Sequence, residues 1–287
     1  MDDLQGKTVL VTGANSGIGF IAAREFARLG AKVLLLCRDS NRGKQARSDI
    51  VAETGNNDVS LYLADFASLC EVAKAGRQIA SEHPEISILC NNAGGANASR
   101  EITGEGFERT LVTNHLAGFL LTKILMPSIL AAARGDHARV IFTSSLGHKN
   151  SPLDFDDLNL EQGYGTLKAY GRTKLMNLLT ARHLHRLHGQ DSVVASSFHP
   201  GAVRTPIWKK GGFLASLIGT LMYPFMWSEE KGADTLVWLA TSNDELACHA
   251  EGQYFFDRRL VAIAKFATDE AAEKLWQVSE ELVAPYL

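Results

Sequence analysis

Short runs of β-branched and leucine-rich residues recur along the chain, and stretches with helical periodicity separate them. The runs predict strands at Thr8–Val11, Lys32–Cys37, Val59–Leu63, Ile86–Cys90, Arg139–Ser144 and Val193–His199. Each run is apolar almost throughout rather than alternating, which is expected when helices bury both faces of a parallel sheet. We therefore predict an α/β fold with a mostly parallel sheet flanked by helices on both faces.

Two helices have clear beginnings in the sequence. The first is predicted over Ile18–Leu29, where Ser16 precedes the apolar run and Gly30 ends it. A later helix is predicted over Glu229–Ala240, because Ser228 suits an N-cap and glutamates in the first turn interact favourably with the helix dipole. The first strand, the first helix and the second strand therefore form a β-α-β unit.

The chain has the organisation of a single domain. Its 287 residues contain no repeat of fixed period and no linker rich in proline or serine, so we predict one domain over residues 1–287. The segment from about 206 to 228 is less regular, and its apolar face and glycines suit a lid over a substrate pocket. Periodicity alone supports an amphipathic core helix there equally well.

Composition and charge narrow the range of partners. Lysine and arginine number 29 and the acidic residues 32, which gives a formal net charge of −3 at pH 7. The chain has no basic run, so nucleic acid is not an expected partner. The sequence does not determine the oligomeric state, and both a monomer and a homo-oligomer are compatible with it.

Cysteine spacing and the length of the apolar stretches indicate the cellular compartment of the protein. The four cysteines lie far apart and form no zinc or redox motif. The acidic start passes directly into the first strand and lacks a signal-peptide pattern. The apolar stretch Phe213–Trp227 is shorter than the ~20 residues that a membrane helix needs. We therefore expect a reduced, cytoplasmic protein without a transmembrane segment.

A glycine-rich loop joins the first strand to the first helix, where ligands of open α/β sheets bind. Glycines there permit positive φ and a close approach of the backbone, and free amides at a helix start attract phosphate. The loop predicts a dinucleotide site, although a tight turn whose glycines serve packing alone is the alternative. The loop, with spacing G-x-x-x-G-x-G, contributes Gly13, Asn15, Ser16, Gly17, Ile18 and Gly19.

The end of the second strand determines the preference between cofactors. An acidic side chain there accepts hydrogen bonds from a free ribose 2′-hydroxyl, whereas a 2′-phosphate requires a cation. Arg38 follows the strand and offers a planar fork suited to phosphate, so we predict NADP(H), with Asp39 turned to solvent or paired. An ordinary exposed arginine is the alternative.

Tyr170 and Lys174 are four residues apart, on the same face of a predicted helix. A nearby ammonium lowers the pKa of a phenol, which lets a tyrosine exchange a proton with an alcohol or a carbonyl near neutral pH. Tyr164 and Lys168 repeat this spacing, but a rotation of about 600° separates the two tyrosines, so only one can face the site. Tyr164 stands between two glycines, whereas Tyr170 leads into a sustained helical pattern. We therefore assign proton transfer to Tyr170.

Two serines end the strand that precedes this helix. Ser144 and Ser145 lie at the carboxyl edge of the predicted sheet, where a hydroxyl can polarise a carbonyl. The alternative is an ordinary turn at the strand end.

Three histidines share the same helix. His183, His185 and His188 have no carboxylate or cysteine nearby to complete a set of metal ligands. A solvated helix face is favoured, and no metal is predicted.

These motifs follow one another in an order that resembles the short-chain dehydrogenase/reductase family over nearly the whole chain, and this implies a single doubly wound Rossmann domain. The gap between Ser145 and Tyr170 is longer than the commonest spacing of the family, which fits its retinol-dehydrogenase-like branch. The family motifs are the glycine loop, Asn91-Asn92-Ala93-Gly94, Ser145, Tyr170/Lys174 and His199-Pro200-Gly201. The branch is indicated by Leu36-Cys37-Arg38-Asp39, Thr113-Asn114-His115-Leu116, Asp156-Asp157-Leu158-Asn159 and Gly252-Gln253-Tyr254-Phe255.

The resemblance implies roles for further residues. Ser145 matches the catalytic serine that orients the substrate oxygen, and Asn114 matches the position that holds a water between Lys174 and solvent. The adenosine side of the cofactor site corresponds to Asn91, Ala93 and Gly94, and the adenine contact to Asp65 and Phe66. Thr205 matches the residue that receives the nicotinamide amide, and the same cofactor-binding segment includes Pro200 and Val203.

We predict an NADP(H)-dependent oxidoreductase that interconverts a carbonyl and an alcohol on a small, largely apolar substrate. Tyr170 is the general acid and base, Ser145 fixes the substrate oxygen, and Lys174 holds the ribose and tunes the phenol. The alternative is a catalytically silent NADP(H)-binding sensor, whose usual mark would be a missing tyrosine, lysine or serine.

Overall fold

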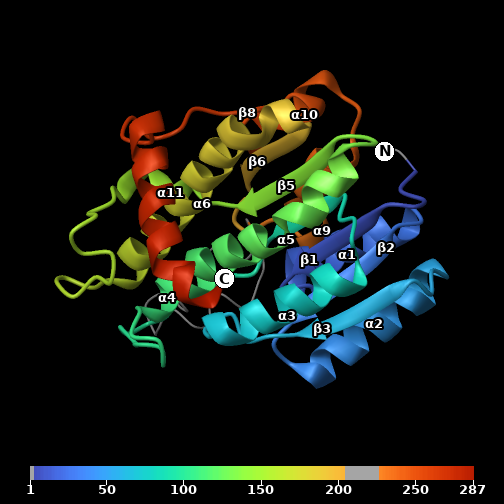
Figure 1. Cartoon of the computed structure of the whole chain (residues 1–287), viewed down its shortest axis with the longest axis horizontal. Coiled ribbons are helices and arrows are strands. Elements are labelled where there is room, and N and C mark those ends of the chain that lie inside the picture. The colour runs from blue at the N-terminus through green and yellow to red at the C-terminus, as the bar shows by residue number, and fades with distance from the viewer. Residues whose placement is uncertain (1–2, 204–225) are drawn as a thin grey trace.

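The computed structural model describes residues 3–203 and 226–287, which build one eight-stranded sheet with helices on both faces (Figure 1). The spatial order of the strands is β3-β2-β1-β4-β5-β6-β7-β8, with every neighbouring pair parallel except β7 and β8. The strands are β1 (Thr8–Thr12), β2 (Lys32–Cys37), β3 (Val59–Leu63), β4 (Ile88–Asn91), β5 (Ala138–Thr143), β6 (Val193–His199), β7 (Tyr254–Phe256) and β8 (Arg259–Leu260). The predicted α/β fold with a mostly parallel sheet is confirmed.

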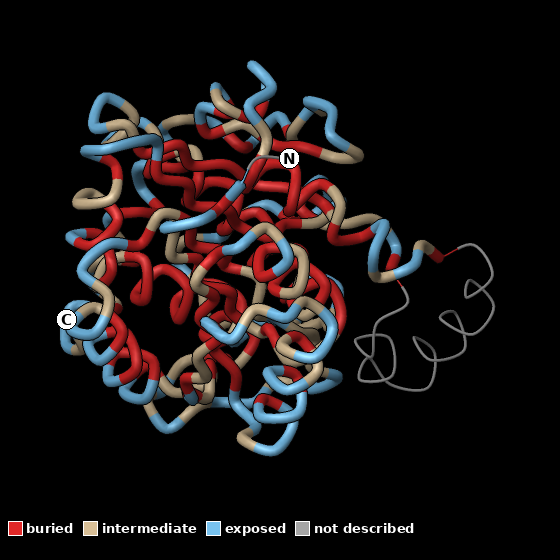
Figure 2. The backbone as a smooth tube through the Cα atoms, turned by 90° about the vertical axis from the view of Figure 1, so that its right-hand side faces the viewer, coloured by how far each residue is buried: buried red, intermediate tan, exposed pale blue. Residues whose placement is uncertain are grey.

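The strand sequences explain the burial of both faces. Successive side chains of a strand point to opposite faces, so an apolar run must be covered twice. In β2, Leu34 and Leu36 pack in the core with α3 (Leu69–Glu82) and α5 (Ala117–Ala133), while Val33 and Leu35 pack in the core with α1 (Gly17–Arg28) and α9 (Glu229–Thr241). Figure 2 shows the buried backbone passing through the middle of the molecule.

The remaining long helices complete the two outer layers. On the side of α3 and α5 lie α6 (Thr166–His188) and α11 (Asp269–Val283), while α2 (Ser40–Thr54) lies beside α1 on the other side. Parallel strands bring all their carboxyl ends to one edge of the sheet, so every loop that follows a strand from β1 to β7 reaches that edge.

The predicted helix beginnings agree closely with the structure. Ser16 occupies the N-cap of α1 in an extended conformation, and Ser228 occupies the N-cap of α9. The Ser228 hydroxyl accepts a hydrogen bond from the Lys231 amide at 3.2 Å, as an N-cap serine should. Strand β4 begins two residues later than expected because the Ile86 amide donates to the Ser128 carbonyl.

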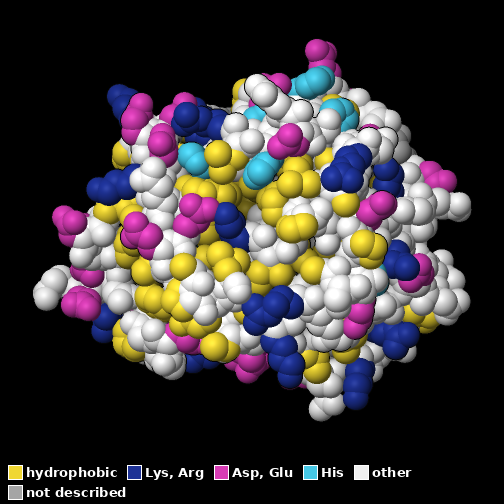
Figure 3. Space-filling view, viewed as in Figure 1, with side chains coloured by type: hydrophobic (Ala, Val, Ile, Leu, Met, Phe, Trp, Pro, Cys, Tyr) yellow, Lys and Arg dark blue, Asp and Glu magenta, His cyan; other side chains and the backbone are white. Residues whose placement is uncertain are grey.

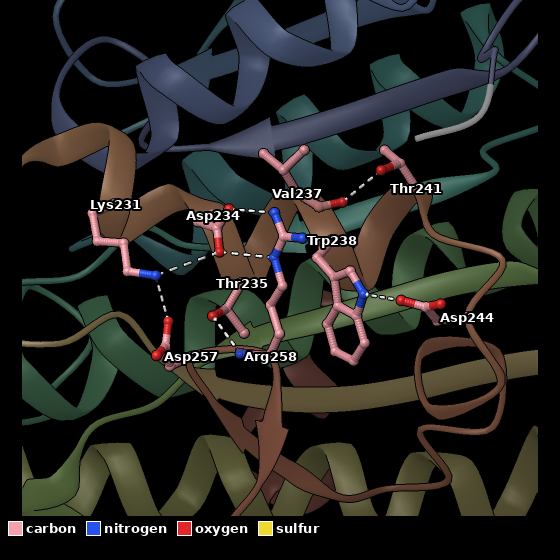
Figure 4. A network of polar contacts seen from close by, with 9 residues as sticks. All are labelled: Lys231, Asp234, Thr235, Val237, Trp238, Thr241, Asp244, Asp257 and Arg258. Carbon is pink, nitrogen blue, oxygen red and sulfur yellow. Dashed lines mark hydrogen bonds and ion pairs between the residues drawn. The ribbon is translucent and has the colours of Figure 1, made fainter.

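A tight hairpin between β7 and β8 was not predicted, since strands of three and two residues carry little periodicity. Its central residues, Asp257 (φ 51°) and Arg258 (φ 59°), both lie in the left-handed region, as a two-residue type I′ turn requires. Figure 4 shows how α9 holds this turn: Lys231 bonds to Asp257 at 2.5 Å, Arg258 pairs with Asp234, and the Arg258 amide donates to Thr235. These contacts offset the strain of non-glycine residues at positive φ.

Within the described ranges, one continuous helical stretch, Arg109–Ala133, has the length and mean hydropathy of a membrane span. It comprises α4 (Arg109–Leu111), a π-helical turn η1 (Val112–Leu116) and α5, and 61 % of its most apolar window is buried inside the protein. This burial between the sheet and α3 is the property of a core helix in the α/β fold. The predicted lid over residues 206–228 lies outside the described residues except for its last three.

Candidate active site

The glycine loop brings the end of β1 into close contact with the chain after β4. Gly13 (φ 67°) and Gly17 (φ 59°) adopt left-handed conformations that favour glycine. A Cβ atom at Gly19 would lie 2.5 Å from the Gly13 carbonyl oxygen, and one at Gly13 would lie 3.1 Å from the Cα atom of Ala93. These glycines are therefore required by close packing of backbone as well as by conformation.

The same loop leaves amide groups available at the start of α1. Ser16 occupies the N-cap, but its side chain makes no capping hydrogen bond, unlike the N-cap side chains of α2, α3, α9 and α11. The first-turn amides of a helix have no partner within the helix, and they carry the positive end of its dipole. A glycine cradle with uncapped amides fits a pyrophosphate, so the residues present suit the dinucleotide that the sequence predicts.

Thr12, for which no role was predicted from the sequence, joins the end of β1 to the chain after β4. The Thr12 hydroxyl accepts hydrogen bonds from the amides of Asn92 and Ala93, both at 2.9 Å, and donates to the Cys90 carbonyl at 3.2 Å. The Asn92 side-chain amide donates in return to the Thr12 carbonyl at 3.0 Å. The available signal was the polar residue at the end of an apolar strand, directly before Gly13.

The Asn91 side chain, at the end of β4, points into the protein toward α5. Its amide donates to the Thr122 hydroxyl at 2.9 Å, and its Oδ1 atom is buried without a hydrogen-bond partner among the described residues. Asn91 therefore reaches into the interior toward α5, so any contact that it makes with adenosine would come from its backbone.

The side chains after β2 and β3 lie at one end of the carboxyl edge. Arg38 is exposed, and its guanidinium lies 3.8 Å from the Asp65 carboxylate. Asp39 caps α2, because its carboxylate accepts the Arg42 amide at 3.0 Å. Phe66, which follows Asp65 in the sequence, is buried. The sequence expectation that Asp39 is paired is thus met by a helix cap, and Arg38 is the side chain left toward solvent.

Ser145, Tyr170 and Lys174 come together at the carboxyl end of β5. Ser145 follows β5, and its hydroxyl lies near enough to the Tyr170 phenol of α6 to act on the pKa of that phenol. Lys174, one turn further along α6, is buried and places its Nζ atom 5.4 Å from the centre of the Tyr170 ring. That ammonium donates to the Thr143 carbonyl at 3.0 Å. Spacing along one helix face therefore puts the phenol and the amine in one site, as predicted.

The protonation of this site differs from the expectation that Lys174 lowers the pKa of the phenol. Burial raises the pKa of Tyr170, and the neighbouring Ser145 side chain only opposes that rise. Burial also lowers the pKa of Lys174 to about 8. Desolvation disfavours the charged form of both groups.

Asn114 lies on the π-helical turn η1 and reaches the same site. Its side-chain amide donates to the Gly95 carbonyl at 2.8 Å and to the Thr173 hydroxyl at 3.0 Å, while its oxygen accepts the Gly95 amide at 2.7 Å. A Cβ atom at Gly94 would lie 3.1 Å from Asn114 Oδ1 and 3.3 Å from Lys174 Nζ. The loop after β4 therefore passes between these two side chains, and π-turns of this kind are frequent at functional sites.

The second tyrosine of the repeated spacing lies elsewhere. Tyr164 precedes α6, and its hydroxyl donates to the Asn97 carbonyl at 3.0 Å. Lys168 is exposed and bonds to the Gly163 carbonyl. Ser144 is fully buried and donates to the Lys174 carbonyl at 2.7 Å, which is a structural bond between β5 and α6. The choice of Tyr170 over Tyr164 for catalysis stays a prediction, and Tyr170 is the one that contacts Ser145.

The segment after β6 is described as far as Val203. Pro200 is half-buried, and Val203 is buried and pairs with Trp227 in an isolated β-bridge. The loop passes so close to Trp227 that a Cβ atom at Gly201 would lie 2.6 Å from the indole. Thr205, the predicted contact for the nicotinamide amide, lies outside the described residues.

The histidines of α6 differ from the solvated face that the sequence suggested. His183 is buried and its ring lies 5.2 Å from that of Trp276 on α11, while His188 pairs with Asp191 at 3.1 Å. The expectation of a solvated face is therefore wrong for His183, since α11 covers it. Among the residues that the structure describes, no three His, Cys, Asp or Glu side chains gather closely enough to hold a metal.

Comparison with known proteins agrees with this architecture. The profile of the short chain dehydrogenase family matches residues 7–212. A Streptomyces sp. (strain C5) protein that bears the name of a daunorubicin C-13 ketoreductase, DnrU, is 40 % identical over 98 % of this chain and 93 % of its own length. Retinol dehydrogenase 13 of Homo sapiens is 37 % identical over 98 % of this chain and 85 % of its own length.

Solved structures show the same fold. A protein from Mycobacterium paratuberculosis superposes with a TM-score of 0.77 and 27 % identity, covering 99 % of this chain and 96 % of that one. A NAD(P)-dependent gluconate 5-dehydrogenase, so named, from Beutenbergia cavernae superposes with a TM-score of 0.68 and 25 % identity, covering 88 % and 95 %.

The doubly wound sheet, with a glycine cradle and a Ser-Tyr-Lys group at its carboxyl edge, defines a Rossmann-fold oxidoreductase. The chain belongs to the short-chain dehydrogenase/reductase family, and its relatives include retinol dehydrogenases and a ketoreductase. The predicted resemblance to the retinol-dehydrogenase-like branch is thereby confirmed.

Proposed function

We propose that this protein is an NADP(H)-dependent oxidoreductase that interconverts a carbonyl and an alcohol on a small, largely apolar substrate. The observation that carries the proposal is the Tyr170 phenol, which lies near the Ser145 hydroxyl and one helical turn from the buried Lys174 amine. This group stands at the carboxyl edge of the sheet, beside the end of β5, which lies two strands from β1 and its glycine loop. A proton donor beside a dinucleotide site is the arrangement that hydride chemistry requires.

The residues at the edge fit the dinucleotide. Gly13, Gly17 and Gly19 with the uncapped amides of α1 would hold the pyrophosphate, and Lys174 would hold the ribose. When bound, NADPH supplies a hydride to the carbonyl carbon.

The phosphorylated cofactor is favoured by the side chains after β2. A cofactor without the 2′-phosphate is usually recognised by a carboxylate at this position. The Asp39 carboxylate is engaged as the cap of α2, and the exposed Arg38 guanidinium is the group available to a phosphate. The Beutenbergia cavernae relative is described with NADP bound.

The protein groups divide the proton chemistry between them. Ser145 accepts the Gly147 amide at 3.3 Å, which leaves its hydroxyl proton free to donate to the substrate oxygen. Tyr170 donates its phenolic proton to that oxygen during reduction, and in the reverse direction it takes the proton back. A raised pKa keeps the phenol protonated at neutral pH, so the site is better prepared for reduction than for oxidation. Lys174 and Asn114 provide the route by which the phenol regains its proton.

An apolar substrate is supported by the name of the retinol dehydrogenases among the relatives, since retinol is largely a hydrocarbon ring and chain. On the face shown in Figure 3, charged side chains of both signs are interspersed around central hydrophobic ones. A small neutral carbonyl compound is the class of substrate that we propose. We also propose a cytoplasmic location for the protein.

Purified protein should oxidise NADPH when it is mixed with a panel of aldehydes and ketones that includes apolar members. Loss of absorbance at 340 nm measures the reaction. Binding of NADPH without its oxidation across the whole panel would contradict the proposal and favour a nucleotide sensor.

A further inference from the structure

The Ser145 backbone is held by one neighbouring side chain. Its carbonyl accepts two hydrogen bonds from His148, one from the backbone amide at 3.2 Å and one from ring nitrogen Nδ1 at 2.7 Å. His148 lies in the short 3-10 helix η2 (Leu146–Asn150), for which Ser145 is the N-cap. The orientation of the Ser145 hydroxyl therefore depends on where this ring sits.

The opposite nitrogen of the ring fixes its tautomer. His148 Nε2 accepts the backbone amide of Ala264 at 3.3 Å, and Ala264 lies 116 residues further along the chain. Because an amide can only donate, Nε2 must carry a lone pair and Nδ1 must carry the proton. Burial lowers the pKa of His148, which keeps the ring neutral. The neutral Nδ1–H is then a fixed donor to Ser145.

A tyrosine fixes the plane of the ring. Tyr254, the first residue of β7, packs edge-to-face on His148 with 4.8 Å between ring centres and 74° between planes. His148 has no exposed surface, and Tyr254 has almost none. The ring is thus held by a hydrogen bond at each nitrogen and by an aromatic contact with Tyr254, and these contacts fix its position and its plane.

We propose that His148 is a positioning residue for the reaction, because its Nδ1–H holds the Ser145 carbonyl and thereby places the Ser145 hydroxyl. This inference rests on the proposed function of Ser145 as the group that orients the substrate oxygen. The Ser145 hydroxyl must point at that oxygen from beside the Tyr170 phenol, and a misplacement of about 1 Å can cost about a hundredfold in rate. A histidine that served only to fill space could be replaced by another buried side chain without such a loss.

Two polar replacements separate the two bonds of the ring. His148→Asn places an amide NH₂ near the position of Nδ1 and keeps a donor to Ser145, but it does not reach Ala264. His148→Gln places its amide oxygen near the position of Nε2 and keeps an acceptor for Ala264, but it lacks the donor to Ser145. His183→Gln is the matched control, because His183 is also a buried histidine of the same protein and packs on Trp276.

The test measures kcat and KM for ketone reduction, together with the Kd for NADPH. We expect His148→Gln to lose about tenfold or more in kcat, and His148→Asn and His183→Gln to stay within about threefold of the wild type, with little change in the Kd for NADPH. Equal losses in the Asn and Gln variants, or no loss in either, would overturn the proposal.

Hydrogen exchange of the peptide 143–151 provides a readout that does not need activity. The amides of this peptide should exchange faster in His148→Gln than in His148→Asn, since the first loses the bond that holds Ser145. Should the wild type reduce no carbonyl compound, the proposed function fails while this comparison still decides the positioning role. Equal exchange in the two variants would refute it.

Discussion

Burial, rather than the neighbouring lysine, has the larger influence on the protonation of Tyr170. The Lys174 amine is buried and Tyr170 is partly buried, and desolvation pushes each toward its neutral form. A sequence shows that two groups can face each other, but it does not show how much water reaches them. The expectation of a lowered phenol pKa was wrong for that reason, although the pairing itself was predicted.

The pH dependence of the two reaction directions should follow from these shifts. Reduction needs a protonated phenol, whose pKa is raised, and a charged Lys174, whose pKa is about 8. We expect kcat for reduction to be level through neutral pH and to fall as the pH rises past about 8, whereas alcohol oxidation, which needs phenolate, should gain from rising pH. A reduction rate that increases between pH 7 and pH 9 would argue against this assignment.

The cofactor preference depends on one exposed arginine. Arg38→Ala removes the guanidinium while leaving the Asp39 cap of α2 in place. Charge-assisted bonds to a phosphate contribute about 1.5–3 kcal/mol, so the Kd for NADPH should rise by about tenfold or more while the Kd for NADH changes little. Fluorescence titration measures both constants, with Arg42→Ala as the control. Equal weakening of the two cofactors would show that Arg38 does not select the phosphate.

Several residues of the site could not be found from the sequence because their partners are remote. Thr12 bonds to residues about 80 positions later, and His148 accepts from Ala264. A polar residue at a strand end has many possible partners, and only the fold determines which one it meets. The motif residues were accessible because their chemistry is carried by short local spacing.

At the scale of elements, the loop between β1 and α1 is constrained by close backbone contacts at Gly13 and Gly19. Its residues were predictable, since glycine is the residue type that such backbone contacts require. The π-turn η1 was not predicted, because a π-turn differs from an α-helix by one residue in its hydrogen bonding and leaves no periodic signal. The hairpin of β7 and β8 was missed because its strands are too short to show alternation.

Gly19 tests the contact between loop and helix. Gly19→Ala would place a methyl group 2.5 Å from the Gly13 carbonyl oxygen, so the loop must shift away from α1. We expect the Kd for NADPH to rise by about tenfold or more, while the far-ultraviolet circular dichroism stays that of an α/β protein. Gly135→Ala is the control, because a Cβ atom there meets nothing within 4 Å. Unchanged binding in Gly19→Ala would show that the loop does not hold the cofactor.

At the scale of the whole molecule, continuous apolar runs were enough to predict the layered sheet, because burial on both faces leaves no room for alternation. The sheet is joined to a covering helix by buried polar groups as well as by apolar packing. Arg139 of β5 is buried and donates to the Leu239 carbonyl at 2.7 Å and the Ser242 carbonyl at 2.8 Å, at the end of α9. One side chain thereby satisfies the carbonyls of a helix from the other layer.

Removal of this link should destabilise the fold. Arg139→Met leaves two carbonyls without their charged donor, and we expect the free energy of unfolding to fall by about 2–4 kcal/mol. Urea denaturation measures the change. Lys32→Met is the control, because Lys32 makes an exposed ion pair with Asp58 at 3.8 Å and should change stability by less than about 1 kcal/mol. A similar loss in both variants would contradict the role given to Arg139.

The most direct test of the whole account is the comparison of Tyr170→Phe with Tyr164→Phe. Positioned proton transfer contributes about a hundredfold to ten-thousandfold in rate. We predict that Tyr170→Phe loses carbonyl reduction by about a hundredfold or more and still binds NADPH with nearly the wild-type Kd, while Tyr164→Phe keeps its activity. An active Tyr170→Phe variant, or an inactive Tyr164→Phe variant that still binds NADPH, would contradict the account.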